Sequence, residues 1–296
     1  MAFSERDDRI LHSITATKKW SVGFLSTYVN KMKGFYYYQR DLKEIRGSKT
    51  TVGSILYHIM NTESRTVDFI EWNKALDQLP KRWVHDKYGI SFSEDTPGKS
   101  LLEVYFEEIY TKFNGFIPRQ DDVVFDVGSQ YGDFALLCSI YFKSARVICF
   151  EPYSENFNIL EKNINLNSCT NISINGCAVG KKEGISRIYL SGDMGTKNGS
   201  GKFEDVKVVK LDSFIQEKVT LLKIDAEGFE LDVLEGAVET LKTQKPRIIL
   251  ETHSIELKKK CLSFLSNYGY RLIWEGRTTK SKLEGMDYVQ NLYLSC

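Results

Sequence analysis

Apolar residues in the second half of the chain alternate between short continuous runs and longer stretches with helical spacing. The runs at 123–127 and 146–150 are rich in Val, Ile and Phe, which is typical of buried parallel strands. The residues around 134–142, between these runs, have the spacing of a helix. Because strands that alternate with helices form parallel sheets with right-handed crossovers, this pattern predicts an α/β domain.

The same alternation continues towards the C-terminus. Further strands are predicted at 172–174, 185–190, 206–211, 221–224, 247–250, 271–274 and 288–294, and further helices at 154–164, 231–241 and 257–265. The 15 residues at 191–205 contain four glycines, which predicts a hairpin loop without fixed structure, with a lid as the alternative. The last two strands are expected to form a hairpin that completes the sheet.

The first 115 residues have a different, mainly helical pattern. An apolar stripe with helical spacing stops at Pro80, since proline interrupts helices. Ser100 and Glu103 form a capping-box pair in front of a second apolar stripe, which predicts another helix. We therefore expect a mainly helical N-terminal cap at 1–115 and the α/β domain at 116–296.

Composition and charge narrow the class of protein. The 296 residues are 42% hydrophobic and 27% charged, as in ordinary globular proteins. The formal net charge is +1, so no excess of positive charge indicates a nucleic-acid partner. No apolar run is long enough to span a bilayer and the N-terminus does not resemble a signal peptide, so a cytoplasmic location is expected. The six cysteines lack metal-binding or disulfide spacing and are interpreted as reduced.

The most informative segment is 123–133, Val-Val-Phe-Asp-Val-Gly-Ser-Gln-Tyr-Gly-Asp. Gly128 and Gly132 fall where a strand must turn into a helix, and a helix N-terminus offers unpaired N–H groups to a ligand. Glu151 follows the second strand, where a carboxylate can accept hydrogen bonds from the two hydroxyls of a ribose. The pattern therefore predicts a nucleoside-binding site.

The residue before this turn distinguishes between nucleoside cofactors. A pyrophosphate-binding turn favours Gly-x-Gly-x-x-Gly, whereas here three residues separate Gly128 from Gly132, and Asp126 precedes them. A carboxylate at that position repels a diphosphate and favours an amine or another cation. S-adenosylmethionine carries an ammonium and a sulfonium, so it fits this turn better than a nicotinamide dinucleotide does.

A second group of polar residues follows two later strands. Asp225 and Glu227 come directly after the strand at 221–224, and Glu251 and His253 end the next strand. Side chains two residues apart in an extended chain share a face, and the carboxyl ends of parallel strands meet at one edge of a sheet. Both pairs are therefore expected at the same edge as the nucleoside site. Helix capping by the acidic residues and a structural role for the histidine are the alternatives.

Together these motifs resemble the FkbM family of class I S-adenosylmethionine-dependent methyltransferases. The matching elements are Asp126-x-Gly128-x-x-x-Gly132, Glu151-Pro152-x-x-x-Asn156, Lys223-Ile224-Asp225-Ala226-Glu227-Gly228-Phe229-Glu230 and Glu251-x-His253. The resemblance covers about residues 118–275 and implies a Rossmann-like, mostly parallel seven-stranded sheet and methyl transfer, usually to oxygen. Ser129 and Gln130 depart from the family's usual Ala-Asn.

The resemblance also implies which residues bind the cofactor. Asp126, Gly128 and Gly132 would hold the methionine end, Glu151 the ribose, and Cys177 and Ala178 the adenine, with Gln130, Pro152 and Asp225 as further contacts. S-adenosylhomocysteine is then the product. The expected acceptor is a hydroxyl of a sugar, glycan or other small metabolite, and the N-terminal cap is expected on the acceptor side.

Methyl transfer to a hydroxyl requires the removal of a proton. His253 is the first candidate for the general base because the ordinary histidine pKa of about 6.5 suits neutral pH, with Asp225 or Glu227 second. A divalent cation held by the carboxylates and the histidine is a less favoured hypothesis. A nicotinamide-dependent oxidoreductase and a nucleoside-binding scaffold without turnover are the alternative functions. The sequence leaves the acceptor and the oligomeric state open.

Overall fold

The computed structural model describes residues 69–106, 108–191, 194–197, 199–276 and 290–296. The chain divides into two compact units, 1–67 and 68–296, and all of the described residues lie in the second unit. The boundary expected near residue 115 falls inside this unit. The part of the expected N-terminal cap before residue 69 lies outside the described residues.

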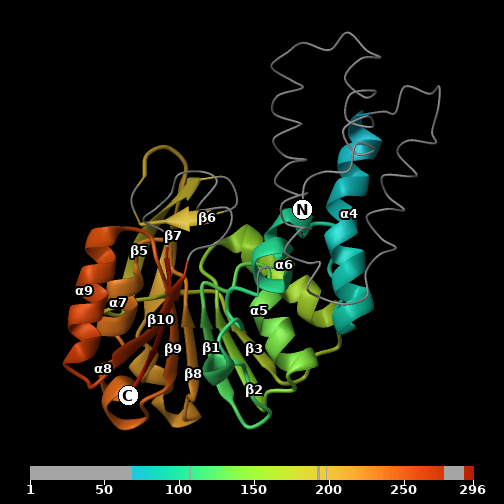
Figure 1. Cartoon of the computed structure of the whole chain (residues 1–296). Coiled ribbons are helices and arrows are strands. Elements are labelled where there is room, and N and C mark those ends of the chain that lie inside the picture. Colours follow the sequence, from blue (N-terminus) through green and yellow to red (C-terminus); the bar gives the residue numbers. More distant parts are fainter. Residues whose placement is uncertain (1–68, 107, 192–193, 198, 277–289) are drawn as a thin grey trace, which may run out of the picture. The chain divides into compact units, whose positions relative to one another are not determined.

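The second unit is built around a seven-stranded sheet in the order β10-β11-β9-β8-β1-β2-β3 (Figure 1). Its strands are β1 (Val123–Val127), β2 (Arg146–Phe150), β3 (Ile172–Asn175), β8 (Leu221–Ile224), β9 (Arg247–Thr252), β10 (Arg271–Gly276) and β11 (Gln290–Ser295). The strands from β3 to β9 in this order are parallel, whereas β11 is antiparallel to both of its neighbours. The mostly parallel sheet and its C-terminal hairpin are therefore confirmed.

The sheet grows in two directions from β1. The chain first adds β2 and β3 on one side of β1, and it later adds β8 and β9 on the other side. Such a reversal of strand order opens a crevice at the carboxyl ends of the strands, where ligands bind in open α/β sheets. The carboxyl ends of β1, β2, β8 and β9 are the places where the sequence puts its candidate residues.

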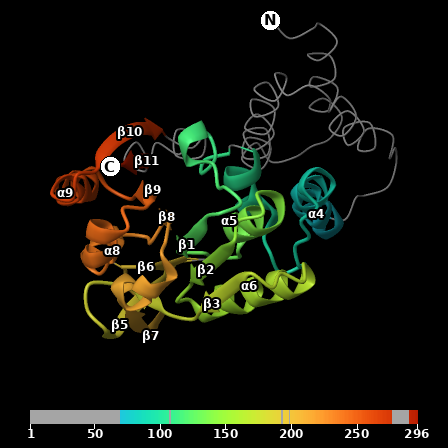
Figure 2. The same ribbon diagram turned by 90° about the horizontal axis from the view of Figure 1, so that it is seen from below.

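Helices cover both faces of this sheet (Figure 2). One face packs against α4 (Phe69–Tyr88), α5 (Asp133–Leu136), the π-helix at Leu137–Tyr141 and α6 (Ser154–Leu166). The other packs against α7 (Glu230–Glu235), α8 (Val238–Thr243) and α9 (Ile255–Ser266). Val124 belongs to the first core and Phe125 to the second, because side chains alternate along a strand. Asp126 therefore points to the same face as α5.

A smaller sheet follows β3. It consists of β4 (Ala178–Val179), β7 (Phe203–Val209), β5 (Gly184–Ser191) and β6 (Met194–Thr196), in that order across the sheet. The strands expected at 185–190 and 206–211 are thus confirmed as β5 and β7. The expectation of a loop without fixed structure between them is wrong at 194–196, because these residues pair with β5 as β6.

Two expectations for the segment before β1 are wrong. The helix α4 continues through Pro80, and Lys81, directly after the proline, is buried and bound to Asp77 and to the carbonyl oxygen of Glu94. The long helix expected after residue 100 is reduced to a π-helical turn at Leu102–Phe106, because Glu108 has a φ of 54° in the left-handed region. Among the described residues, no helix has both the length and the apolar character needed to cross a membrane.

Candidate functional site

The turn after β1 has the left-handed conformation that its glycines allow. Gly128, Gln130 and Gly132 have φ values of 76°, 46° and 82°. The Gly128 N–H donates to the carbonyl oxygen of Phe150 on β2 at 2.9 Å, and Gly132 is the N-cap of α5. The turn therefore connects β1 directly to α5 while it stays bonded to β2.

Gly128 also touches the second half of the site. A Cβ atom at this position would lie 1.7 Å from the carbonyl oxygen of Asp225. No side chain fits there, so the turn after β1 packs backbone to backbone against the loop after β8. The contact of Gly128 with the cofactor, which would use its backbone, stays a prediction.

Ser129 replaces the usual alanine of the family and is buried. Its hydroxyl donates to the carbonyl oxygen of Asp126 at 2.6 Å and accepts the N–H of Phe150 at 3.2 Å. The hydroxyl therefore joins the ends of β1 and β2. The serine hydroxyl therefore finds its hydrogen-bond partners within the fold, and this departure from the family pattern leaves the turn intact.

Asp126 and Lys223 form a buried ion pair beneath the turn. Lys223 Nζ lies 3.1 Å from Asp126 Oδ1 and donates to the carbonyl oxygen of Gly128 at 2.6 Å. Burial alone would lower the pKa of the lysine, but the carboxylate of Asp126 and two further aspartates raise it, so Lys223 is charged. Asp126 is therefore compensated by the charge of Lys223, although neither of its carboxylate oxygens accepts a hydrogen bond from a described residue. Its contact with a cofactor stays a prediction.

Glu151 lies beside the turn at the end of β2. Its Oε2 accepts the Gln130 N–H at 2.8 Å, and its Oε1 accepts the Tyr153 N–H, just after Pro152, at 2.9 Å. Each carboxylate oxygen has further lone-pair capacity for a ligand hydroxyl. Burial raises the pKa of this carboxyl to about 7, against the opposing effect of the two backbone hydrogen bonds. The geometry is compatible with the ribose contact, which stays a prediction.

The residues expected at the adenine follow β3. Cys177 and Ala178 are both buried, and Ala178 packs in one apolar cluster with Tyr153. The Glu151 N–H donates to the carbonyl oxygen of Asn175 at 3.1 Å, which holds the ends of β2 and β3 together. The expected ribose and adenine contacts therefore come from adjacent segments.

The second cluster is assembled as the sequence predicts. His253 Nε2 lies 3.4 Å from Glu227 Oε2, 3.7 Å from Asp225 Oδ1 and 4.0 Å from Glu251 Oε1. On the other side of the ring, Nδ1 lies 2.8 Å from Oε1 of Glu230, whose side chain is fully buried. Four carboxylates therefore surround one imidazole at the carboxyl ends of β8 and β9.

These carboxylates change the charge of His253. Burial lowers its pKa, but the hydrogen bond with Glu230 and the charges of Glu227 and Asp225 outweigh burial, so the pKa is raised well above its ordinary value. The raised pKa disfavours His253 as the general base, and its role in proton transfer stays a prediction.

Three residues of the site were given no role by the sequence analysis. The Tyr110 hydroxyl donates to Asp225 Oδ2 at 3.0 Å. Lys223 pairs with Asp126 beneath the turn after β1, and Glu230 bonds to His253 in the second cluster. Lys223 and Glu230 lie in the quoted motif, and a lysine inside an apolar strand is a signal that a carboxylate lies opposite. Nothing in the sequence around Tyr110 indicates its contact.

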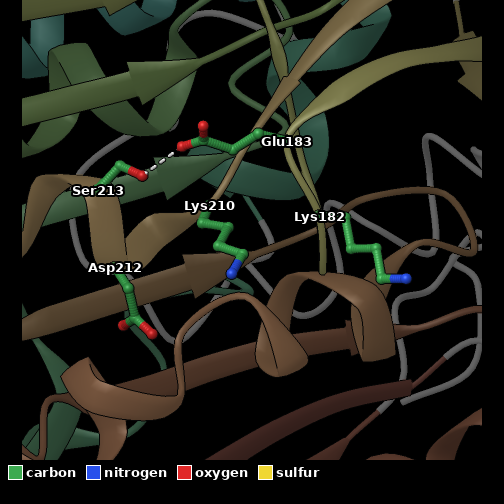
Figure 3. Close-up of a pocket in the computed structure, with 5 residues that line it drawn as sticks. All are labelled: Lys182, Glu183, Lys210, Asp212 and Ser213. Atoms are coloured by element: carbon green, nitrogen blue, oxygen red, sulfur yellow. Dashed lines mark hydrogen bonds between the residues drawn. The ribbon is translucent and has the colours of Figure 1, made fainter.

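A surface hollow lies outside this site. It is lined by Lys182, Glu183, Lys210, Asp212 and Ser213 (Figure 3). Ser213 Oγ donates to Glu183 Oε1 at 2.7 Å, and Asp212 Oδ1 accepts the Thr240 N–H at 2.9 Å. These bonds connect neighbouring segments of the fold, and none of the predicted site residues lines the hollow.

The fold and the site together define a class of protein. A parallel sheet with an antiparallel strand inserted beside its last member, a glycine turn after β1 and an acidic residue after β2 are the features of Rossmann-like class I methyltransferases. Residues 126–272 match the methyltransferase FkbM domain. The chain belongs to the FkbM family of S-adenosylmethionine-dependent methyltransferases.

Several known proteins are similar to this chain. It is 29% identical over 151 residues to the hexuronic acid methyltransferase AglP of Haloferax volcanii, across 46% of this chain and 58% of AglP. It is 25% identical over 213 residues to the 31-O-demethyl-FK506 methyltransferase FkbM of Streptomyces tacrolimicus, across 58% of this chain and 81% of that protein. A crystal structure of a methyltransferase FkbM from Methylobacillus flagellatus KT superposes with a TM-score of 0.49 at 18% identity, over 75% of this chain and 54% of that chain. The chain thus spans little more than half the length of AglP and of that crystallised protein.

Proposed function

We propose that this protein transfers the methyl group of S-adenosylmethionine to a hydroxyl of a sugar, glycan or other small metabolite. Family membership supports methyl transfer, and the names of two relatives specify a hexuronic acid and 31-O-demethyl-FK506. The observation that carries the proposal is the contact between the turn at Gly128 and the loop at Asp225, which brings the Glu151 segment and the His253 cluster to one sheet edge.

The residues around the turn after β1 fit this cofactor. The two oxygens of Glu151 have acceptor capacity for the ribose hydroxyls, and the buried Cys177 and Ala178 offer an apolar contact for an adenine. The remaining proposed contacts are Asp126, Gly128, Gln130, Gly132, Pro152 and Asp225. When bound, the cofactor supplies a methyl group that is already activated for transfer. The protein must then align the acceptor hydroxyl and accept its proton.

Glu227 is the proton acceptor in this proposal. Its side chain is 27% exposed, whereas Glu251 is 9% exposed and Glu230 is fully buried. Asp225 already accepts the Tyr110 hydroxyl through Oδ2. The bound cofactor would supply the methyl group to the acceptor oxygen and keep the electron pair of the broken carbon–sulfur bond, and the Glu227 carboxylate would take the hydroxyl proton. His253 holds the surrounding carboxylates in place. The segment before β1 is proposed to shape the acceptor side.

Ligand binding and turnover together test this function. S-adenosylhomocysteine should raise the melting temperature of the protein and NAD should not. Glu151→Ala should remove most of this shift, whereas Glu161→Ala, which changes an exposed glutamate on α6, should keep it. Transfer of a labelled methyl group should then be measured on oligosaccharides that contain uronic acids and on small alcohols. No shift with S-adenosylhomocysteine contradicts the proposal, and a shift without product on any acceptor favours a scaffold without turnover.

A further inference from the structure

We propose that Asp225, Glu251 and His253 form a binding site for a divalent cation of the Mn²⁺ or Mg²⁺ type. Each residue offers one ligand atom, a carboxylate oxygen or a ring nitrogen, and the three atoms lie within 4.8 Å of one another. Two carboxylates and an imidazole are ligands that first-row divalent cations accept. Asp225 follows β8, Glu251 lies near the end of β9 and His253 follows β9, so all three lie at the carboxyl ends of adjacent parallel strands.

Buried oxygens without a partner support this site. Asp225 Oδ1 and Glu251 Oε2 are shielded from solvent and accept no hydrogen bond from any residue in the described part of the chain. The Glu251 side chain is only 9% exposed. Leaving a buried oxygen without a partner costs about 1–3 kcal/mol, unless a donor or a cation compensates. A single cation beside both residues would compensate both oxygens.

The ring of His253 is held in the manner of a metal-bound histidine. Glu230 Oε1 accepts the N–H groups of Gly228 at 3.0 Å and Ala226 at 3.3 Å, so it also acts as the acceptor for His253 Nδ1 at 2.8 Å. This arrangement directs Nε2 towards the other carboxylates. In metal sites, the imidazole nitrogen that does not bind the metal commonly donates to a carboxylate. This hydrogen bond fixes the tautomer and the orientation of the ring.

The distances between the candidate ligands are also informative. His253 Nε2 lies 3.7 Å from Asp225 Oδ1 and 4.0 Å from Glu251 Oε1, beyond the length of a hydrogen bond of about 2.7–3.2 Å. Metal–ligand bonds of about 2.0–2.2 Å place neighbouring ligands about 3.0–3.5 Å apart. Contraction of these separations, which are at most 4.8 Å, to about 3.0–3.5 Å would bring all three atoms to such a cation.

A protonated His253 is the competing account of the cluster. An imidazolium would neutralise one negative charge, but it has one N–H on this side of the ring and can serve only one of the two unpartnered oxygens. A divalent cation can bind both carboxylates at once and brings twice the charge. The geometry therefore favours the cation over the imidazolium.

Three protein ligands would leave coordination positions for the acceptor hydroxyl beside Glu227. A cation in that place lowers the pKa of the hydroxyl and makes transfer of its proton to Glu227 easier. This role in the reaction rests on the proposed methyl transfer, whereas the binding of the cation does not.

Direct titration with Mn²⁺ tests the site. The full-length protein, freed of metal with a chelator that is then removed, should bind one Mn²⁺ per chain in calorimetry and electron paramagnetic resonance. Glu251→Gln and Asp225→Asn keep the side-chain size and should weaken binding by about 100-fold, and Glu230→Gln, which changes the outer partner, by about 10- to 100-fold. Glu161→Gln, an exposed change on α6, should bind as the unmodified protein does.

Nuclear magnetic resonance provides a second measurement that does not depend on the folding of variants. Mn²⁺ should broaden the ring signals of His253 at substoichiometric concentration and leave those of the exposed His85 sharp. No binding at millimolar Mn²⁺, equal affinity in all variants, or equal broadening of the two histidines would overturn the cation site. Mn²⁺ binding without methyl transfer contradicts only the proposed function. Full methyl transfer in excess chelator, together with no Mn²⁺ binding, contradicts only the cation site.

Discussion

Lys223 Nζ lies 3.1 Å from Asp126 Oδ1, and both side chains are almost completely buried in the centre of the sheet. The pair is possible because the parallel register places Asp126 of β1 directly beside Lys223 of β8. The lysine also donates to the carbonyl oxygen of Gly128, so one buried cation holds both the aspartate and the turn that follows it.

Lys223→Met should therefore destabilise the protein strongly. Removing one partner of a buried pair leaves the other charge uncompensated and costs about 3–5 kcal/mol. We expect the free energy of unfolding in urea to fall by this amount, and Asp126→Asn in the same variant to restore part of it. Lys242→Met removes an exposed lysine paired with Glu239 and should change stability by less than about 0.5 kcal/mol. Equal stability of the two lysine variants would contradict the role of the buried pair.

Gly128→Ala should disturb both halves of the site at once. The new methyl group would overlap the carbonyl oxygen of Asp225, 1.7 Å away, so the loop after β8 must move. Gly269→Ala is a matched control, because Gly269 also has a positive φ, 87°, but no atom lies within 4 Å of the added Cβ. The control should cost about 1–2 kcal/mol of strain, and Gly128→Ala should cost more and also weaken S-adenosylhomocysteine binding. Equal stability and affinity in the two variants would show that the close contact is unimportant.

The sequence predicts the main sheet and the position of the site for the same physical reason. Strands buried on both faces, such as 123–127 and 221–224, are continuous apolar runs that differ from their surroundings. Once these strands are placed, their carboxyl ends are fixed, and polar residues such as Glu151 and His253 fall at one edge. The order of strands within the sheet then decides which of these polar residues are neighbours.

Contacts between distant segments could not be predicted in this way. Tyr110 reaches Asp225 across 115 positions, from a turn that forms where Glu108 adopts a positive φ. The pairing of Asp126 with Lys223 depends on the register between β1 and β8, which no local pattern encodes. The raised pKa of His253 follows from Glu230, Glu227 and Asp225, whose distances to the ring become known only in the folded chain.

The buried carboxyl of Glu151 should make stability depend on pH. Its folded-state pKa of about 7 lies above the ordinary value of 4.5, so folding favours the protonated form. This contribution is fully present below pH 4.5 and is lost as the pH rises through about 7. Denaturant unfolding between pH 4 and 8 should show this decrease, and Glu151→Gln should remove it. The difference between the two proteins isolates Glu151 from Asp133, whose pKa burial also raises to about 7.

The same carboxyl should give cofactor binding the opposite dependence on pH. Ribose hydroxyls donate to the ionised form of Glu151, so the affinity for S-adenosylhomocysteine should rise by about tenfold from pH 6 to pH 8. Calorimetry across this range should show the rise in the unmodified protein and a flat profile in Glu151→Gln. A rise of equal size in Glu151→Gln would assign the titration to another group and contradict the ribose contact.

Tyr110 is expected to position Asp225 for the reaction. Its hydroxyl donates to Asp225 Oδ2 at 3.0 Å, and without this bond the carboxylate is free to rotate away from His253. Tyr110→Phe should therefore lower kcat for methyl transfer by about 10- to 100-fold, because small displacements of reacting groups have large effects on rate.

Tyr105→Phe is the matched control for this prediction. The Tyr105 hydroxyl is equally buried and donates to the carbonyl oxygen of Asp133 at 2.8 Å, on the same face of the sheet but with no bond to the carboxylate cluster. Each substitution removes one buried hydrogen bond and should lower the free energy of unfolding by about 1–2 kcal/mol. Only Tyr110→Phe should lower kcat, since only this hydroxyl holds a carboxylate next to His253. If both variants keep full kcat, Asp225 needs no support from Tyr110, and if both lose it equally, the loss reflects stability alone.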